Sequence, residues 1–293
     1  MSRRLGLLLV AGLVAAGSLV AVVLARDDGP LAKTIPNHAF GSLTGAKDPI
    51  SVWAIGDGAA GTPASRALGR QIARTDPDRV LYLGDVYESG TPEEFKTRFD
   101  TAYGALLDRM LPTPGNHEWP QRAEGYNPYW KGVTHAPTPP WYAVQLGDWQ
   151  VLSLNSEADH GAGSPQVRFL DRQLTKPAPC RLAFWHRPRY SAGTHGDQDD
   201  MAPVWDRLAG RATLVLGGHD HDLQRFKPIH GTTELVDGAG GRDRYPVDGS
   251  DTRLAFSDDS QFGAVKLALH PTSADVRFVG LGGKVIDRST VTC

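Results

Sequence analysis

The sequence predicts one large domain of the α/β class, in which helices alternate with the strands of a mixed sheet. Short apolar runs of strand length alternate with stretches that carry helical signals, which is typical of an α/β sheet. These runs cover residues 50–55, 80–83, 181–185 and 213–216. A hairpin signal, Gly147-Asp148, lies between two apolar strips within residues 141–154, and it adds an antiparallel pair to the expected sheet.

The clearest helix signal covers residues 92–110. Thr91 and Glu94 are spaced as a capping box, and Pro92 occupies the first turn. Apolar residues then recur on one face of the expected helix, namely Phe95, Phe99, Leu106 and Met110. Further helices are expected at 63–74, 165–174 and 203–208. Strand-like stretches return after residue 225, near Glu234, Val265 and Val276, so the sheet is expected to be mixed.

The N-terminus has the composition of an export segment. Arg3 and Arg4 precede an apolar stretch, 5–25, that is broken only by Gly and Ser. Residues 1–25 are therefore predicted to be a signal peptide or, if the segment is not cleaved, a membrane anchor, with cleavage slightly favoured. Residues 26–49 lack a hydrophobic period and are expected to be a spacer before a domain at 50–293. The protein is expected to be exported, either secreted or held in the cell envelope.

The chain contains two cysteines, Cys180 and the C-terminal Cys293. An exported protein meets oxidising conditions in which such a pair persists as a disulfide. We expect this bond to tie the chain end to the strand that leads to His186. The alternative is two unpaired thiols, which is less favoured because a free thiol at an exposed terminus is reactive.

Charge and composition exclude several classes of function. The formal net charge is −2, and the contents of apolar (40%) and charged (22%) residues are ordinary for a globular domain. The sequence therefore has no basic field that would gather a nucleic acid, and none is expected as a partner. A negatively charged substrate has to be attracted locally, which bound metal ions can do.

Short polar elements follow the apolar runs directly. Four of them are Gly56-Asp57-Gly58, Gly84-Asp85-Val86-Tyr87, His186-Arg187-Pro188 and Gly217-Gly218-His219-Asp220-His221, and a fifth, Pro114-Gly115-Asn116-His117-Glu118, follows residues 110–113. Sites in open α/β sheets assemble at the carboxyl ends of strands, so five loops are expected to meet on one edge. Asp, Asn and His side chains suit metals of intermediate hardness, whereas the near absence of cysteine argues against thiolate sites.

In their order and spacing these elements resemble the five motif blocks of the calcineurin-like metallophosphoesterases. The resemblance extends from about residue 51 to residue 221 and implies a four-layer α/β/β/α sandwich with two mixed sheets. Within that superfamily the chain is most similar to small, single-domain purple acid phosphatases, because Ala59 stands where other members have a ligand histidine. Those enzymes use a tyrosine instead. Tyr87 is the candidate here, although it follows Asp85 by two residues rather than by three.

The resemblance also implies roles for individual residues. Asp57, Asp85 and His221, with Tyr87, would hold a first metal ion, and Asp85 would bridge to a second ion held by Asn116, His186 and His219. His117 is similar to the histidine that contacts the phosphate, and His195 to a second such histidine. The implied cofactors are iron with zinc, manganese or iron, or two divalent ions such as manganese or zinc. Glu118 is open to two interpretations, as a residue that orients its neighbours or as one that faces water.

The expected function is hydrolysis of phosphate monoesters by a hydroxide that two metal ions activate, as in an acid phosphatase acting on a phosphorylated small molecule. One alternative is phosphodiester hydrolysis with the same metals. A second alternative is a non-catalytic envelope protein that has kept the fold. Residues 119–140, which contain Tyr126, Tyr129 and Trp130, are expected either to form a wall of the substrate cleft or to be a packed surface loop.

Overall fold

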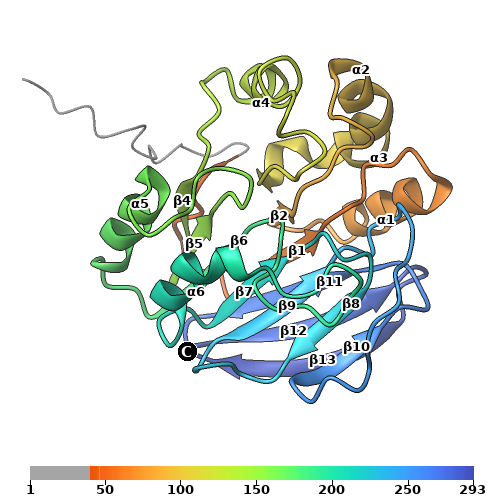
Figure 1. Ribbon diagram of the computed structural model, residues 1–293. Helices are drawn as coiled ribbons and strands as arrows, with labels where there is room; N and C mark the ends of the chain where they lie inside the picture. The colour runs from red at the N-terminus through yellow and green to blue at the C-terminus, as the bar shows by residue number, and fades with distance from the viewer. Residues whose placement is uncertain (1–39, 46) are drawn as a thin grey trace, which may run out of the picture.

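The computed structural model of the protein describes residues 40–45 and 47–293, and its strands form two sheets (Figure 1). The first sheet has the spatial order β13-β12-β11-β1-β2-β3. Its members are β1 (Ile50–Ile55), β2 (Arg79–Tyr82), β3 (Met110–Pro112), β11 (Gly263–His270), β12 (Ser273–Gly280) and β13 (Val285–Thr292). Strands β1, β2 and β3 run parallel to one another, whereas β11 pairs with β1 in the antiparallel sense.

The second sheet has the spatial order β10-β8-β9-β7-β6-β5-β4. Its members are β4 (Tyr142–Leu146), β5 (Trp149–Ser153), β6 (Cys180–Phe184), β7 (Leu214–Gly217), β8 (Leu223–Phe226), β9 (Thr233–Asp237) and β10 (Leu254–Asp258). The neighbours from β5 through β6 and β7 to β9 are parallel, and β4, β8 and β10 add antiparallel pairs. Both sheets are therefore mixed, and the expected hairpin is the β4–β5 pair.

Helices cover the outer faces of the sheets and complete the four-layer sandwich. They are α1 (Pro63–Ala73), α2 (Pro92–Glu94), α3 (Asp100–Tyr103), α4 (Tyr126–Thr134), α5 (Pro165–Leu174) and α6 (Ala202–Leu208). The strand β6 shows how the second sheet is buried on both faces. Leu182 and Phe184 belong to the large core cluster that includes both sheets, while Ala183 and Trp185 pack with the apolar residues of α5 and α6. Successive side chains of a strand point to opposite faces, which explains this division.

The helix predicted at 92–110 is composite and ends one residue early. The capping box at Thr91 and Glu94 is present, but a π-helical turn, Phe95–Phe99, separates α2 from α3, and a 3₁₀ segment, Gly104–Arg109, follows. Met110 is not helical, because it begins β3 and pairs with Val80 of β2. The predicted helix at 165–174 is confirmed, while those at 63–74 and 203–208 differ from α1 and α6 by one residue at one end.

The tract 119–140 is a packed layer that contains α4. The ring of Trp130 contacts those of Phe40 and Phe99 edge-on, and Tyr129 stacks on Phe95 with ring centroids 4.4 Å apart. Edge-to-face and offset contacts of this kind are favourable for aromatic rings. The aromatic residues of this tract therefore pack against the first sheet's helices and the chain before β1. This agrees with the interpretation of the tract as a packed surface loop.

The export segment predicted at 1–25 lies outside the described residues. Within residues 40–45 and 47–293, none of the helices combines the length and apolarity that a membrane span requires. The end of the stretch expected to be a spacer contacts the domain, because the Phe40 N–H donates to the Met110 carbonyl (2.9 Å) and Leu43 bridges to Leu146.

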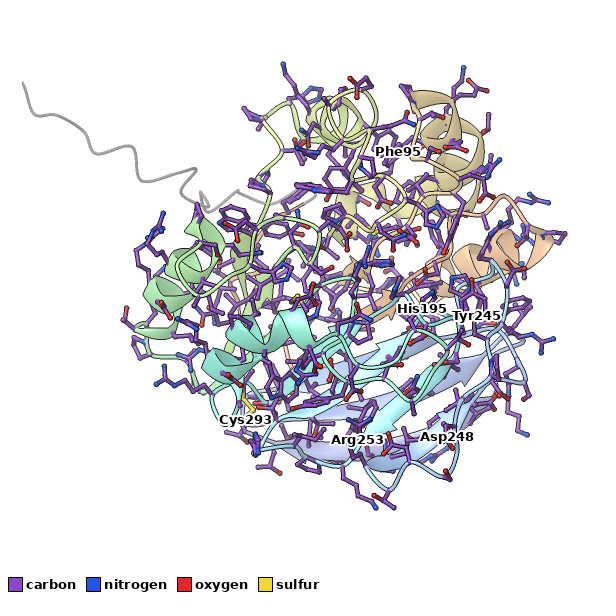
Figure 2. All side chains as sticks on the ribbon, viewed as in Figure 1. Phe95, His195, Tyr245, Asp248, Arg253 and Cys293 are labelled. Carbon is purple, nitrogen blue, oxygen red and sulfur yellow. A yellow bond between two sulfur atoms is a disulfide. The ribbon has the colours of Figure 1, made fainter. Side chains whose placement is uncertain are left out.

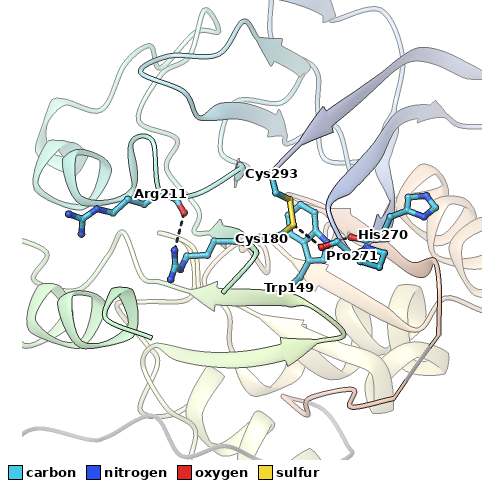
Figure 3. The surroundings of a disulfide bond; sticks show 7 residues. Trp149, Cys180, Arg211, His270, Pro271 and Cys293 are labelled. Carbon is cyan, nitrogen blue, oxygen red and sulfur yellow. Dashed lines mark hydrogen bonds between the residues drawn. A yellow bond between two sulfur atoms is a disulfide. The ribbon is translucent and has the colours of Figure 1, made fainter. Parts of the chain in front are cut away.

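A disulfide joins Cys180 to Cys293, with the Cα atoms 5.2 Å apart (Figure 3). Cys180 begins β6 in the second sheet, and Cys293 follows β13 at the edge of the first. The bond therefore links the two sheets at the chain end, and the expected pairing is confirmed. Because disulfides persist in oxidising compartments, this bond is consistent with an extracytoplasmic location.

Glu234 of β9 gives the fold a pH dependence that can be measured. Its buried carboxylate accepts the N–H groups of Arg189 (2.8 Å) and Tyr190 (2.9 Å). Burial raises the pKa of Glu234 to about 8, despite the opposing effect of these two bonds. In the unfolded chain Glu234 has its ordinary, lower pKa and loses its proton at a lower pH than in the folded state. Between these two pKa values, Glu234 therefore makes folding less favourable as the pH rises.

The substitution Glu234→Gln should remove this contribution. Between about pH 5.5 and about pH 7.5, the unfolding free energy of the wild type should fall by about 2 kcal/mol relative to that of the variant. Urea unfolding of both proteins at the two pH values measures the difference. Equal pH dependence in the two proteins would show that Glu234 is ionised in the folded state throughout.

Candidate metal centre

Loops after five strands bring the predicted site residues to one edge of the sandwich. Asp57, Asp85 and His219 all have left-handed backbone conformations, with φ values of 57°, 72° and 70°. Such values are uncommon for residues other than glycine and cluster at functional sites. Gly84 also has a positive φ (102°), and a Cβ there would lie 2.7 Å from Nδ1 of His186, so only glycine fits between these loops.

The first group of side chains surrounds Asp57. The Tyr87 hydroxyl donates to Oδ1 of Asp57 at 2.6 Å and lies 2.9 Å from Nε2 of His221. Oδ2 of Asp57 accepts the backbone N–H of His219 at 2.8 Å. An acidic, a phenolic and an imidazole group thus converge from three loops, and Tyr87 reaches this point although it follows Asp85 by only two residues.

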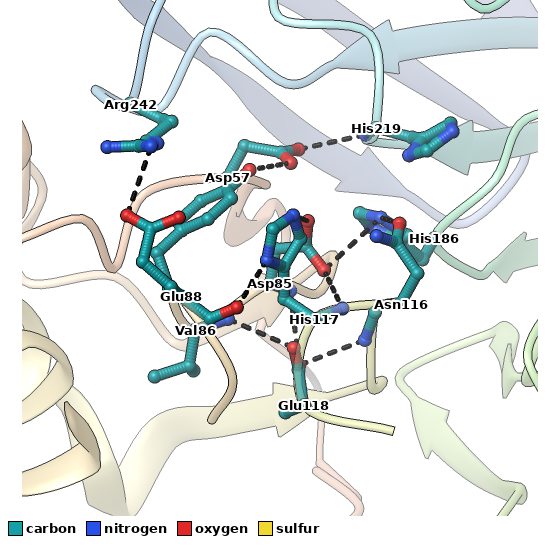
Figure 4. Close-up of polar contacts among 12 residues, drawn as sticks. Asp57, Asp85, Val86, Glu88, Asn116, His117, Glu118, His186, His219 and Arg242 are labelled. Carbon is teal, nitrogen blue, oxygen red and sulfur yellow. Dashed lines mark hydrogen bonds and ion pairs between the residues drawn. The ribbon is translucent and has the colours of Figure 1, made fainter. Parts of the chain in front are cut away.

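The second group surrounds Asp85 (Figure 4). Nε2 of His186 lies 3.4 Å from Oδ1 of Asp85 and 3.0 Å from Oδ1 of Asn116. Nδ1 of His186 faces the Leu83 carbonyl at 2.9 Å, so Nε2 is the ring nitrogen directed at Asp85 and Asn116. Asp57, Asp85 and His186 each offer one atom within a group whose members all lie within 4.8 Å of one another.

Glu118 orients the loops of the second group rather than facing water. Its fully buried carboxylate accepts the N–H groups of Asp85 (3.1 Å), Val86 (3.0 Å) and Gly115 (2.9 Å). Burial and the nearby Asp85 carboxylate raise the pKa of Glu118 to about 8. The side chain therefore fixes the backbones of two loops relative to each other, which is one of the two roles expected for it.

Three histidines line the open side of the two groups. His117 is partly exposed, with Nδ1 2.6 Å from the Glu88 carbonyl and Nε2 3.7 Å from Oδ2 of Asp85. His195 stacks on His219, with ring centroids 4.0 Å apart. Burial, together with the neighbouring His186 and His195, lowers the pKa of His219 to about 2, so His219 is neutral at ordinary pH.

Asp220 holds His195 at this position. Oδ1 of the buried Asp220 carboxylate accepts both the backbone N–H of His195 and the proton of its Nδ1, each at 2.9 Å. Its other oxygen accepts the Ser191 hydroxyl. An Asp hydrogen-bonded to one ring nitrogen fixes the tautomer and leaves the other nitrogen directed away from the carboxylate. The motif spacing alone does not show that Asp220 takes part in this way.

The charges of the two buried carboxylates, Asp57 and Asp85, favour binding of cations between them. Burial and the adjacent Asp57 raise the pKa of Asp85 well above its usual range. Burial also opposes ionisation of Asp57, but the hydrogen bond from His221 and the charges of nearby histidines lower the pKa of Asp57 overall. Two buried carboxylates so close together repel when both are ionised, and bound cations relieve that repulsion. The carboxylate, amide, phenol and imidazole donors are those that metals of intermediate hardness prefer.

A family model described as calcineurin-like phosphoesterase matches residues 50–223 of the chain, which is more than half of its length. The chain belongs to the calcineurin-like phosphoesterase family. This metallophosphoesterase carries the buried cluster of Asp57, Asp85 and His186, which the loops after β1, β2 and β6 supply. The two mixed sheets agree with the fold that the resemblance implied.

Curated relatives of this metallophosphoesterase are distant. Purple acid phosphatase 21 of Arabidopsis thaliana is 26% identical over 55% of this chain and 41% of its own length. Tartrate-resistant acid phosphatase type 5 of Mus musculus is 23% identical over 78% of this chain and 84% of its own length. A probable cyclic nucleotide phosphodiesterase of Synechococcus is 26% identical over 60% of this chain and 69% of its own length. The match thus spans only about two fifths of the plant phosphatase.

The solved structure of a purple acid phosphatase from yellow lupin (Lupinus luteus) seeds has the same fold. It superposes with a TM-score of 0.69, at 20% identity, over 85% of this chain and 54% of the lupin chain. The relatives include both phosphatases and a probable phosphodiesterase, so they establish hydrolysis of phosphoric esters at the level of the family and do not decide between the two ester classes.

Two residues near the centre lie in no sequence motif from which their position could be predicted. The ring of Tyr245 stacks on His221 with centroids 4.0 Å apart, and the guanidinium of Arg242 lies 5.1 Å from the ring centroid of Tyr87. Both belong to the segment between β9 and β10, which lies beyond the matched residues 50–223. Only the three-dimensional arrangement relates them to the site.

Proposed function

We propose that this metallophosphoesterase hydrolyses phosphate monoesters of small molecules, as a purple acid phosphatase does. The observation that carries the proposal is the position of Tyr87, whose hydroxyl lies between Asp57 and His221 at 2.6 and 2.9 Å. A tyrosine at this point, in place of a histidine at Ala59, is what the resemblance to purple acid phosphatases implies. The curated relatives that include such phosphatases support the same choice.

Asp57, Tyr87 and His221 would hold one metal ion, and Asn116, His186 and His219 a second, with Asp85 between them. Iron with zinc, manganese or iron fits a site with a phenolate donor, whereas two divalent ions such as manganese or zinc would use the site without it. Bound metal ions would neutralise the charge of the phosphoryl group and activate a water molecule for attack. Elemental analysis of protein purified without added metal identifies the pair.

The chain's own side chains supply binding and proton transfer. His117 lies at the opening of the second group, where its Nε2 can contact a phosphoryl oxygen. Asp220 holds Nδ1 of His195, which would leave the second ring nitrogen of His195 to give a proton to the leaving alcohol. Hydrolysis of a monoester requires contact with the dianionic phosphoryl group. It also requires a proton for the departing oxygen, because an alkoxide is a poor leaving group.

The second candidate is phosphodiester hydrolysis, which the Synechococcus relative favours. The metal-loaded protein should be assayed with p-nitrophenyl phosphate and bis-p-nitrophenyl phosphate, which share one leaving group. We expect kcat/KM for the monoester to exceed that for the diester by about tenfold or more, since a preference of that size needs only about 1.4 kcal/mol of differential transition-state binding. Faster turnover of the diester would favour the second candidate, and turnover of neither ester would favour a non-catalytic protein.

A further inference from the structure

The segment between β9 and β10 forms one side of the candidate site and supplies none of the side chains proposed as metal ligands. It is fastened to the loop that carries His195, because the Asp248 N–H donates to the Ala192 carbonyl (2.8 Å) and Arg253 forms an ion pair with Asp197 (2.7 Å). Figure 2 shows His195 and Tyr245 near each other, with Asp248 and Arg253 lower on the same side of the molecule. The segment is therefore held in a fixed position relative to His195.

Tyr245 of this segment contacts two histidines of the site. Its ring lies parallel to that of His221, with an interplanar angle of 11°, and meets the edge of His195 at a centroid distance of 5.5 Å. Its backbone N–H donates to the His221 carbonyl at 3.1 Å. The side chain remains partly exposed. An aromatic surface thus borders both the first group of side chains and His195.

We propose that Tyr245 contacts the leaving group of the substrate and favours phosphomonoesters whose leaving group is a flat aromatic ring. The inference rests on the proposed function, in which His195 gives a proton to the departing oxygen. The group attached to that oxygen then lies beside His195, where the exposed part of Tyr245 is the adjoining aromatic surface. Aromatic rings at such distances gain additional attraction from offset-stacked or edge-to-face contacts.

The two arginines next to Tyr245 are engaged by groups of the protein itself. Arg242 is paired with Glu88 (3.0 Å) and lies near Asp243 (3.5 Å), so carboxylates neutralise its guanidinium. Arg244 donates to the Ser260 carbonyl and lies over the ring of Phe262. The ring of Tyr245 is therefore the feature of this side that can discriminate between leaving groups.

Binding of two phosphonates to the metal-loaded protein tests the proposal without turnover. Phenylphosphonate and methylphosphonate share the anionic group and differ in the ring. By calorimetry, Tyr245→Ala should weaken phenylphosphonate binding about fivefold, the size of a single aromatic contact, and leave methylphosphonate within about twofold of the wild type. Tyr245→Phe keeps the ring and should bind both phosphonates as the wild type does. Tyr245→Leu serves in place of the alanine variant if the latter does not fold.

Four results would contradict the inference. If both phosphonates weaken equally, Tyr245 acts through His221, and a fall in metal content measured by elemental analysis would accompany that result. If neither phosphonate weakens, the ring does not contact the ligand. If the wild type binds neither phosphonate, the proposed function fails together with the inference, whereas wild-type binding of methylphosphonate alone would leave the function standing and exclude the aromatic preference.

Discussion

Replacing Asp85 with asparagine is expected to lower kcat/KM for a phosphate monoester by about 1000-fold or more, because bound metal contributes several kcal/mol of charge stabilisation to the transition state. Asp85 is fully buried between the two groups of the candidate centre, with Nε2 of His186 3.4 Å from its Oδ1. Asparagine has nearly the same shape but carries no charge, so it would leave two cations without the carboxylate between them. Elemental analysis should show the loss of at least one metal ion per chain.

A matched substitution separates this effect from a general loss of charge. Asp206 is exposed on α6, on the outer face of the second sheet, so Asp206→Asn changes the net charge equally and should leave both activity and metal content unchanged. The Asp85 variant should also remain folded, because it no longer places two acidic groups close together in the interior. Full activity with two metal ions bound to the Asp85→Asn protein would contradict the assignment of Asp85 to the centre.

The sequence predicted the parts of the site that depend on local pattern. An apolar run followed by a polar element signals a strand and the loop at its carboxyl end, which is why Asp57, Asp85 and His186 could be predicted to lie together. The structure brings all nine predicted site residues to one edge, namely Asp57, Asp85, Tyr87, Asn116, His117, His186, His195, His219 and His221. Their assignment to individual metals remains a proposal.

Contacts between distant segments could not be predicted in the same way. Tyr245 follows His221 by many residues of irregular chain, and only the packing of the β9–β10 segment places its ring on His221. Asp220 lies within a motif, but the motif does not indicate that its carboxylate faces His195. Met110 continued the apolar period of a helix, yet tertiary pairing with Val80 makes it a strand residue.

Exchange of Cys293 for serine is expected to lower the free energy of unfolding by about 4 kcal/mol, because the disulfide closes a loop of more than one hundred residues in the unfolded chain. The bond spans a sequence separation of 113 residues. Cys293 is the better partner to change, since it is exposed and serine there buries no hydroxyl, whereas Cys180 is buried. Urea unfolding of the oxidised proteins measures the loss, and the difference should vanish when both proteins are unfolded with a reductant present.

Loss of the disulfide should destabilise β13 first and leave the metal centre unchanged. β13 is an edge strand whose side chains are exposed or half-buried and which pairs with β12 alone, so the disulfide adds a covalent tie at the end of this pairing. Cys180 begins β6, while His186 follows the other end of that strand, roughly 20 Å away at the usual rise per residue. Amide exchange in the Cys293→Ser protein should therefore quicken in β13 while metal content and kcat stay at wild-type values. Loss of metal together with faster exchange near His186 would mean that the bond supports the site directly.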